Sequence, residues 1–351
     1  MTSVDIVVPC YNYAHYLNAC IETIVSQRDV SVRVLIIDDC SPDNTPEVAS
    51  HLAASDPRIT YVRNENNLGL IGTANRGVME WANSDYVVLL SADDQLTPGA
   101  LSRACQLLDA HPEMSMCYGM ALMMWDDGAP LAPDDPLNAE TRIIPGKDFI
   151  RRIFEHGNAV PTPTAVMRTS VQRAIGGYNS LLKHTSDADT WMRAGAVGSI
   201  GVIDAVQGLY RWHAQNMSAA YQRRPIGDRR EMVQTGLEFI RLFGDRVPEA
   251  KEWQKQMERR LAMEALHIAR DSFRKPGDDT WSDSLTFAED HLPGIMLKSE
   301  WWALKARQVI GRSRMHALAR LRARLRSGAD TPDTHGKMWY DHGMQIGFWP
   351  G

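Results

Sequence analysis

The chain has few cysteines, no basic excess and no long apolar run. Its 351 residues include five cysteines, and no two of them form a Cys-x-x-Cys pair, which argues against a zinc knuckle and against a disulfide framework. Reduced thiols in a cytoplasmic protein are the simpler interpretation. The formal net charge of −5 argues against a nucleic-acid partner, because a nucleic-acid-binding protein would carry a basic face.

Two further absences concern membranes and phosphate loops. No stretch of about 18 apolar residues occurs, so we expect no membrane-spanning helix. The segment Met1–Asp5 leads straight into a strand pattern without a basic and then apolar leader, so we expect no signal peptide. After the first strand the chain reads Pro9-Cys10-Tyr11-Asn12, and this segment lacks the Gly-rich, basic phosphate loop expected of a nucleotidyltransferase.

Short β-branched runs alternate with helical spacing over the first 90 residues. The pattern predicts helices over 16–25 and 71–81, and strands over 4–8 (ended by Pro9), 32–37, 59–62 and 86–90. Such alternation predicts a parallel sheet with helices on both faces. Further strands are expected near Met116, Val166, Ile200 and Val206.

The chain becomes almost wholly helical after Tyr221. Helices are predicted over 231–243, 253–273 and 301–325, whereas 331–351 is expected to be extended or loosely docked. The break at 223–227 predicts two parts, an α/β domain over 1–222 and a helical extension over 223–351.

Two pairs of acids follow predicted strands, and both should face the crevice beyond the carboxyl ends of the sheet. Asp93 and Asp94 would repel each other unless a cation such as Mg²⁺ or Mn²⁺ lay between them. Asp38 and Asp39 could accept hydrogen bonds from a nucleotide base or ribose. Each pair could equally cap the helix that follows it.

Two later segments carry further candidates. Asp187 and Asp189 lie where a helix is expected to begin, and a carboxylate there could take a proton from an attacking hydroxyl, or could simply cap the helix. His213 follows a strand, and its imidazole could bind a metal ion or a diphosphate oxygen.

Several motifs, taken in order, resemble the family 2 glycosyltransferases over residues 3–218. They are Val7-Val8-Pro9-Cys10-Tyr11-Asn12, Ile36-Ile37-Asp38-Asp39-Cys40-Ser41, Asn67-Leu68-Gly69 with Asn75, Ser91-Ala92-Asp93-Asp94, Gly176-Gly177-Tyr178, Asp187-Ala188-Asp189-Thr190-Trp191-Met192-Arg193 and Tyr210-Arg211-Trp212-His213. The resemblance implies a GT-A fold, which is a Rossmann-like mixed sheet flanked by helices, here with a helical C-terminal extension.

The resemblance also implies an activity: inverting transfer of a sugar from a nucleotide-diphosphate donor to an acceptor hydroxyl in polysaccharide, glycolipid or other glycoconjugate synthesis. A UDP-sugar is the first candidate donor, with GDP- and dTDP-sugars as alternatives, and the acceptor would be a carbohydrate or a lipid-linked molecule. The implied cofactor is a divalent metal ion, Mn²⁺ or Mg²⁺.

The resemblance assigns roles residue by residue. Asp187 would be the catalytic base, and Asp93 with His213 would hold the metal ion. The donor would be bound by Pro9, Tyr11, Asn12, Asp38, Asp39, Asn67, Gly69, Asn75, Ala92 and Asp93. Secondary candidates are Asp94, Asp189, Trp191, Arg193 and Arg211.

Three positions depart from the family pattern. Ser91 replaces the first acid of the metal motif, Ser186 replaces the Glu before Asp187, and Ala74 replaces an Arg. These departures keep open the alternative of an inactive sugar-nucleotide-binding protein, beside the nucleotidyltransferase disfavoured above.

The predicted helix 301–326 carries eight basic residues and no acid. It could be a solvated helix packed on the catalytic domain. Alternatively, Trp301 and Trp302 could lie at the headgroup level of a membrane while the arginines contact anionic lipid at the inner face of the plasma membrane.

Overall fold

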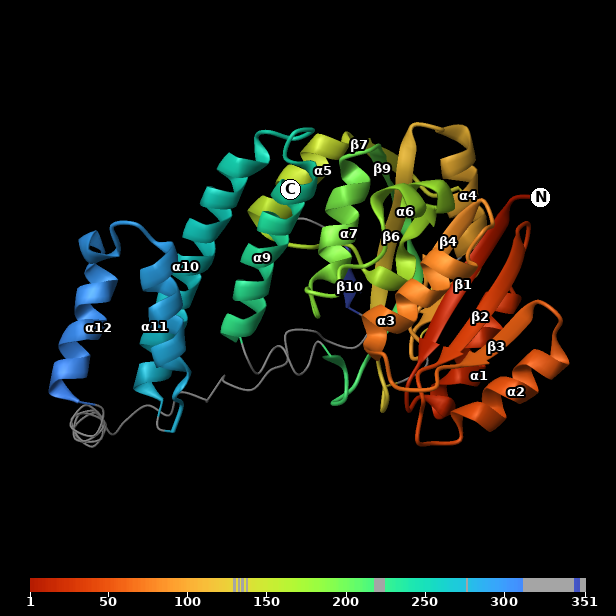
Figure 1. Ribbon diagram of the computed structural model, residues 1–351, viewed down its shortest axis with the longest axis horizontal. Helices are drawn as coiled ribbons and strands as arrows, with labels where there is room; N and C mark the ends of the chain where they lie inside the picture. The colour runs from red at the N-terminus through yellow and green to blue at the C-terminus, as the bar shows by residue number, and fades with distance from the viewer. Residues whose placement is uncertain are drawn as a thin grey trace.

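A computed structural model describes residues 1–128, 131, 133, 136, 138–217, 225–275, 277–311 and 344–347. Figure 1 shows a twisted sheet flanked by helices, with a row of helices extending away from it. The predicted break at 223–227 begins among residues outside the described ranges, so the boundary itself is not seen. The mixed α/β class agrees with the expectation from the sequence.

The first four strands form the parallel part of the sheet, as the alternation predicted. Strand β1 lies between β2 and β4, and β3 pairs with β2. The bounds are β1 Ser3–Cys10, β2 Ser31–Asp38, β3 Ile59–Arg63 and β4 Tyr86–Leu89. The expectation that Pro9 ends β1 is wrong, because the pairing continues through Pro9 and Cys10.

The rest of the sheet is mixed rather than parallel. Strand β8 pairs antiparallel with β4 and β6, whereas β6 and β9 run parallel. The strands expected near Ile200 and Val206 are one continuous strand, β9, with register shifts against β6 between them. The bounds are β5 Gln95–Leu96, β6 Met114–Trp125, β7 Thr141–Ile144, β8 Val166–Arg168, β9 Ser199–Trp212 and β10 Gln345–Ile346.

Alternating side chains of the strands feed two apolar cores, one on each face. On β1, Val7 packs in one core, while Val4, Ile6 and Val8 pack in the other. One face is covered by α1 Ala14–Val25, α2 Thr45–Ser55 and α4 Ala100–Ala110. The other is covered by α3 Gly69–Asn75, the π-helical turn η1 Arg76–Trp81, α5 Gly146–His156, the 3₁₀ turn η2 Thr162–Thr164, α6 Thr169–Ile175 and α7 Ser186–Gly195.

The helical extension continues the second core instead of forming a separate one. Phe239 packs edge-on against Phe154 of α5, and both rings are buried. The bounds are α9 Pro225–Phe243, α10 Ala250–Arg274, α11 Thr280–His291, the 3₁₀ turn η3 Ile295–Leu297 and α12 Ser299–Ile310. The remainder of the predicted helix 301–325 lies outside the described residues. No helix in the described ranges is long and apolar enough to cross a membrane.

A buried carboxylate ties the parallel strands together at the end opposite their carboxyl termini. Asp5 of β1 is fully buried and accepts two hydrogen bonds of 2.8 Å from Arg33 of β2. It also accepts the backbone N–H groups of Asn83 and Ser84, which precede β4. Burial alone would raise the pKa of Asp5, but hydrogen bonds from Arg33 and Ser84 lower it below its ordinary value of 3.8.

We expect Asp5→Asn to lower the free energy of unfolding by about 1–3 kcal/mol at neutral pH, because an amide nitrogen cannot accept the donors that face it. The stability that comes from a lowered carboxyl pKa is present above the ordinary pKa and is lost as the pH falls through the folded-state pKa. The difference between the wild type and the variant should therefore shrink in acid. Urea unfolding measures it, with exposed Glu22→Gln as the matched control. Equal midpoints at neutral pH would contradict this role.

Candidate functional site

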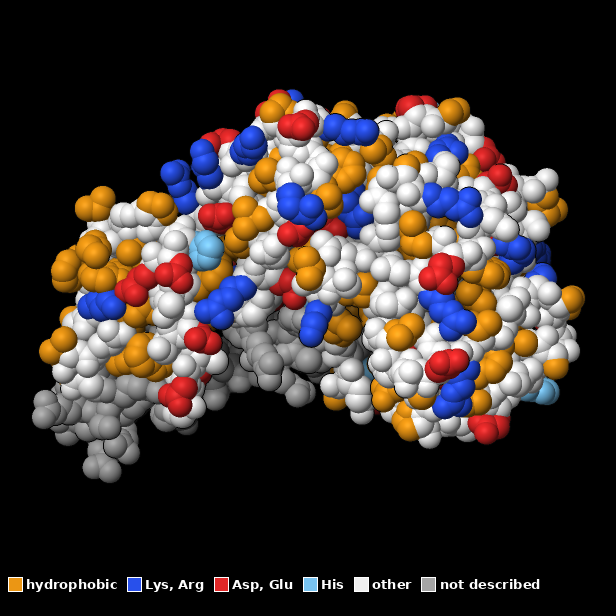
Figure 2. Space-filling model, in the orientation of Figure 1, with side chains coloured by type: hydrophobic (Ala, Val, Ile, Leu, Met, Phe, Trp, Pro, Cys, Tyr) orange, Lys and Arg blue, Asp and Glu red, His pale blue; other side chains and the backbone are white. Residues whose placement is uncertain are grey.

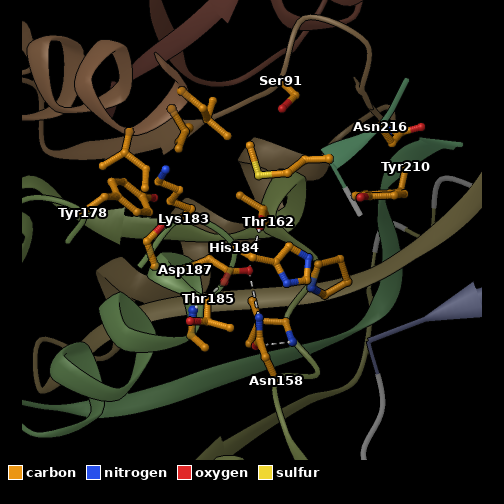
Figure 3. Close-up of a pocket in the computed structure, with 18 of the residues that line it drawn as sticks. Ser91, Asn158, Thr162, Tyr178, Lys183, His184, Thr185, Asp187, Tyr210 and Asn216 are labelled. Carbon is orange, nitrogen blue, oxygen red and sulfur yellow. Dashed lines mark hydrogen bonds between the residues drawn. The ribbon is translucent and has the colours of Figure 1, made fainter. Parts of the chain in front are cut away.

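A cavity of about 1260 Å³ opens at the carboxyl ends of the parallel strands. Its walls come from the ends of β1, β2 and β4, from the start of α7, and from α9 and α10 of the extension. Residues 344–347 at the other end of the chain also line it, where β10 pairs with β6. Figure 3 shows the part of this cavity around Asp187.

Nine of the residues predicted from the sequence line this cavity: Pro9, Tyr11, Asp39, Asn67, Gly69, Ala92, Asp93, Asp94 and Asp187. They come from five separate stretches of the chain. The predicted convergence of acids from β2, β4 and α7 on one cavity is therefore present.

Asp39 lies at the end of β2, and one of its oxygens is already bound. Oδ1 accepts hydrogen bonds of 2.7 Å from the side chain of Asn64 and from the backbone N–H of Leu68. Asp39 Oδ2 has no hydrogen-bond partner among the described residues, and the side chain lines the cavity. This arrangement fixes the carboxylate while leaving acceptor capacity for a ligand donor such as a base N–H or a ribose hydroxyl.

Three predicted donor-binding residues lie outside the lining and shape the turns that form it. Asp38 is fully buried and accepts the backbone N–H of Ser41 at 2.8 Å. Asn12 adopts a left-handed conformation (φ 61°), which Asn tolerates better than most residues, and its N–H donates to Ser41 Oγ. Asn75 bonds both the N–H and the C=O of Tyr178, whose ring lines the cavity.

The Asp93-Asp94 pair follows β4 and is almost completely buried. Asp93 Oδ2 lies 3.1 Å from His213 Nε2 and 3.4 Å from Asn216 Nδ2. Asp94 Oδ1 accepts the backbone N–H of Arg211 at 2.9 Å. Burial and the charge of Asp93 raise the pKa of Asp94 well above its ordinary value. Asp94 therefore anchors the loop to β9, and Asp93 is the acid turned toward His213.

Arg211 of β9 binds the Asp93-Asp94 loop that follows β4, and it does not line the cavity. Its guanidinium donates to the backbone oxygen of Asp93, lies over the ring of Tyr16 at 4.6 Å and pairs with Asp126. His213 stacks on the same Tyr16 ring. These contacts hold Asp93 and His213 next to each other.

The donor set fits a metal ion that is completed by substrate oxygens. In the described part of the chain, no group of three or more His, Cys, Asp and Glu residues could hold a metal ion. Asp93 and His213 supply two ligand atoms only 3.1 Å apart, and Mg²⁺ and Mn²⁺ commonly complete their shells with water and phosphate. His213 Nδ1 now accepts from Gln215 N–H at 3.2 Å, so coordination through Nε2 would require the ring proton to move.

Asp187 lies in the first turn of α7 and is held from one side by a neighbouring loop. Its Oδ2 accepts hydrogen bonds from Asn158 Nδ2 at 2.9 Å and Thr162 Oγ1 at 3.4 Å, drawn as dashed lines in Figure 3. Burial raises the pKa of Asp187, although the positive charge of His184 and the Ala188 N–H partly oppose this. A carboxyl with a raised pKa is better matched to proton abstraction near neutral pH.

Three secondary candidates lie away from the cavity lining. Asp189 and Arg193 form a buried ion pair of 2.9 Å within α7. Arg193 also donates to the backbone oxygen of Gly177 at 2.8 Å, and Trp191 is buried against Tyr178. The helical period explains the placement of Asp189 and Arg193, since residues two and six positions after Asp187 point to the other side of the helix. These side chains fasten α7 to the 175–178 turn.

Several lining residues carried no signal in the sequence. Asn158 and Thr162 lie in a Pro-rich connection, and His184 and Asp228, which also line the cavity, form a 2.7 Å contact. Lys183 and the 344–347 segment also contribute. None belongs to a motif quoted above, and the tertiary fold alone brings them to Asp187. Asp228 and Arg229 line the cavity from α9, which begins before the helix predicted over 231–243.

Comparison with known proteins identifies the same part of the chain. Residues 5–170 match the model described as "Glycosyl transferase family 2". The succinoglycan biosynthesis protein ExoA of Rhizobium meliloti is 30% identical over 203 residues, which cover 56% of this chain and 59% of ExoA. The chain likewise covers only 62% of a Mycobacterium tuberculosis relative that is 27% identical.

Solved structures share the fold. Staphylococcus aureus TarS 1–349 in complex with UDP-GlcNAc superposes with a TM-score of 0.61 at 17% identity, over 84% of this chain and 82% of TarS. The mannosyltransferase PcManGT of Pyrobaculum calidifontis, in complex with GDP-Man and Mn²⁺, gives 0.51 at 17% identity, over 93% and 88%. The fold is thus the GT-A fold that the motifs implied, and residues 5–170 are similar to glycosyl transferase family 2, as the motifs also implied.

Proposed function

We propose that the protein transfers a sugar from a nucleotide-diphosphate donor to an acceptor hydroxyl with inversion at the anomeric carbon, in the synthesis of a polysaccharide or other glycoconjugate. The observation that carries this proposal is the convergence of Asp39, Asp93 and Asp187 on one cavity. The match of residues 5–170 to glycosyl transferase family 2 and the similarity to ExoA, a succinoglycan biosynthesis protein, support it.

We assign donor binding to one side of the cavity and activation of the acceptor to the other. The nucleotide would lie against Pro9, Tyr11 and Asp39, and the diphosphate would lie toward Asp93. Asp187, on the opposite wall, would take the proton of the acceptor hydroxyl as that oxygen attacks the anomeric carbon and the nucleotide diphosphate departs. The hydroxyl attacks from the face opposite the leaving group, so one base and no covalent intermediate suffice for inversion.

Asp93 and His213 would hold a divalent ion, which when bound supplies positive charge to the departing diphosphate. Mn²⁺ is bound to PcManGT, a protein of the same fold, and this supports the choice of Mn²⁺ or Mg²⁺. UDP-GlcNAc and GDP-Man are bound to TarS and PcManGT respectively, so UDP- and GDP-sugars are the first donors to test, followed by dTDP-sugars.

We also propose that residues 1–222 form the catalytic domain and that the extension 223–351 shapes the acceptor side. Arg229 of α9 and Arg260 of α10 line the cavity beyond Asp187 and both bind Glu264. Charged side chains of this kind suit an acceptor rich in hydroxyl groups, such as a carbohydrate or the carbohydrate part of a lipid-linked molecule. All five cysteines are free thiols, which fits a cytoplasmic enzyme.

Asp187→Asn should lower kcat by about 10²–10⁴-fold and leave donor affinity nearly unchanged, because an amide keeps the contacts of the side chain but cannot take a proton. In the wild type, kcat/KM should fall in acid with a limb above pH 3.8, since burial raises the pKa of Asp187 and the protonated acid is inactive. Initial rates across pH measure both, with exposed Asp204→Asn as the control. Full activity of Asp187→Asn would disprove its role as base.

Chelation should abolish transfer, and Mn²⁺ or Mg²⁺ should restore it. Asp93→Asn should lower kcat by at least about 10²-fold, because the ion that neutralises the diphosphate loses its carboxylate ligand. The exposed Asp127→Asn serves as the matched control. Hydrolysis of the donor, followed with and without Mn²⁺, separates an enzyme from an inactive sugar-nucleotide-binding protein. Transfer that is unchanged in EDTA would contradict metal dependence.

The far end of the extension exposes apolar side chains, seen at the left of Figure 2. Leu297 is 89% exposed, Trp302 60% and Val309 86%. Trp301 instead packs inward and donates to Glu289, which also pairs with Lys305. The face of α12 that carries Trp301 therefore fits a solvated helix packed on the rest of the protein. That interpretation does not explain why the apolar side chain of Trp302 is exposed.

We propose that this exposed face contacts an anionic membrane surface. An exposed apolar side chain gains free energy by entering the headgroup boundary, and the eight basic residues between 301 and 326, with no acid among them, complement anionic lipid.

The wild type should sediment with vesicles that contain phosphatidylglycerol and remain in solution with pure phosphatidylcholine. The double variant Leu297→Ser, Trp302→Ser should bind at least about tenfold more weakly, because burial of each side chain contributes roughly 1.5–3 kcal/mol. Leu242→Ser, an exposed position at the end of α9, is the matched control. Equal soluble fractions of the wild type with both vesicles would rule out this contact.

A further inference from the structure

The turn that carries Asp187 is bound from the outside by helix α9. Glu231 Oε1 accepts the backbone N–H of Thr185 at 2.8 Å, the hydroxyl of Thr185 at 3.2 Å and the backbone N–H of His184. The hydroxyls of Thr185 and Thr235 lie 2.6 Å apart. One carboxylate of the extension thus satisfies the donors just before α7, where backbone N–H groups have no partner within the helix.

A second carboxylate of α9, that of Asp228, binds the side chain of His184 in the same turn. His184 Nδ1 lies 2.7 Å from Asp228 Oδ1, and because a carboxylate only accepts, Nδ1 carries the hydrogen. Burial alone would lower the pKa of His184, but the hydrogen bond to Asp228 and the charges of Asp228, Asp187 and Glu231 raise it above 6.5. The ring is therefore a cation over a wider pH range than an ordinary histidine.

Figure 3 shows His184 and Asp187 on the same side of the cavity, with Asn158 beyond them. Asn158 and Thr162 hold Asp187 Oδ2 from the sheet side, and α9 holds the preceding residues from the other side. The turn is fixed between the two parts of the chain. A group that must meet a hydroxyl at hydrogen-bond distance benefits from such fixation, since small displacements of reacting groups lower rates strongly.

We infer that α9 belongs to the catalytic machinery: Glu231 and Asp228 are positioning residues for the turn that carries the base, and His184 supplies the positive charge that keeps Asp187 ionised. This inference rests on the proposed role of Asp187. Nothing in the motifs quoted above assigns a role to His184, Asp228 or Glu231.

The other charged groups that line the cavity around this turn carry more positive than negative charge. They are Lys183 on the same loop, Arg229 on α9, Arg260 and Glu264 on α10, and His156 at the end of α5. Glu264 pairs with both arginines, at 2.8 Å in each case. The positive charge of His184 lowers the pKa of Asp187, so removal of His184 should act on that carboxyl directly.

The test compares kcat, donor KM and the pH profile of kcat/KM for single variants of the full chain. In His184→Gln the acid limb should move to higher pH, because Asp187 loses a nearby positive charge, and in His184→Lys the limb should stay near that of the wild type. Asp228→Asn should move the limb in the same direction as His184→Gln, because a histidine without its carboxylate partner loses its proton at lower pH.

Glu231→Gln should lower kcat by about tenfold or more, with donor KM within about twofold, since the donor side of the cavity is formed by other elements. Glu238→Gln is the matched control, because Glu238 lies two turns further along α9, is buried, and accepts hydrogen bonds from Gln234 and Arg241 of the same helix. A kcat loss in Glu231→Gln but not in Glu238→Gln, at comparable melting temperatures, supports positioning.

Two results separate failure of this inference from failure of the proposed function. If Asp187→Asn is inactive while His184→Gln leaves the acid limb in place and Glu231→Gln behaves like Glu238→Gln, the role of α9 is overturned and the base assignment stands. If Asp187→Asn retains full transfer activity, the proposed base and this inference both fail.

Discussion

Several carboxylates are buried together at one edge of the sheet, and the site depends on the hydrogen-bond donors and positive charges that offset the cost of burying them. A buried carboxylate is costly unless it is paired or hydrogen-bonded, and neighbouring carboxylates raise that cost. Each acid here meets a different partner: Asp39 accepts from Asn64 and Leu68, Asp94 from Arg211, and Asp93 lies against His213. The partners determine which acids are structural and which keep acceptor capacity for a ligand.

The sequence predicts the part of the site that follows from local pattern. Apolar runs locate β1, β2, β3 and β4, and the rule that ligands lie beyond the carboxyl ends of strands places Asp39 and Asp93 in one crevice. The helical start at Asp187 is also visible, because small and acidic residues precede an apolar stripe. These features depend on residues close together in the chain.

The sequence does not predict contacts made between distant segments. Glu231 and Asp228 reach the turn before α7 from more than 40 residues away, as the pairs His184–Asp228 and Thr185–Glu231 show. No spacing rule connects such positions. Likewise, the pairing of Gln345 and Ile346 with β6, which brings the end of the chain into the cavity wall, has no local signature. Asp189 shows the converse case. The sequence made it a candidate site residue, but in the structure its carboxylate forms a buried ion pair with Arg193.

The extension is joined to the α/β part through one continuous apolar core, so polar contacts at the α7–α9 junction rest on a rigid base. A junction of this kind can align a base on one part with an acceptor held by the other. Variation in the extension could then change the acceptor while Asp39, Asp93 and Asp187 keep the donor chemistry.

A crystal structure of the protein with a bound sugar nucleotide and Mn²⁺ would test the central claim most directly. The account predicts the base and ribose beside Asp39, the ion between the diphosphate and Asp93, and the anomeric carbon turned toward Asp187. Density for the nucleotide outside this cavity, or with the sugar directed away from Asp187, would contradict it.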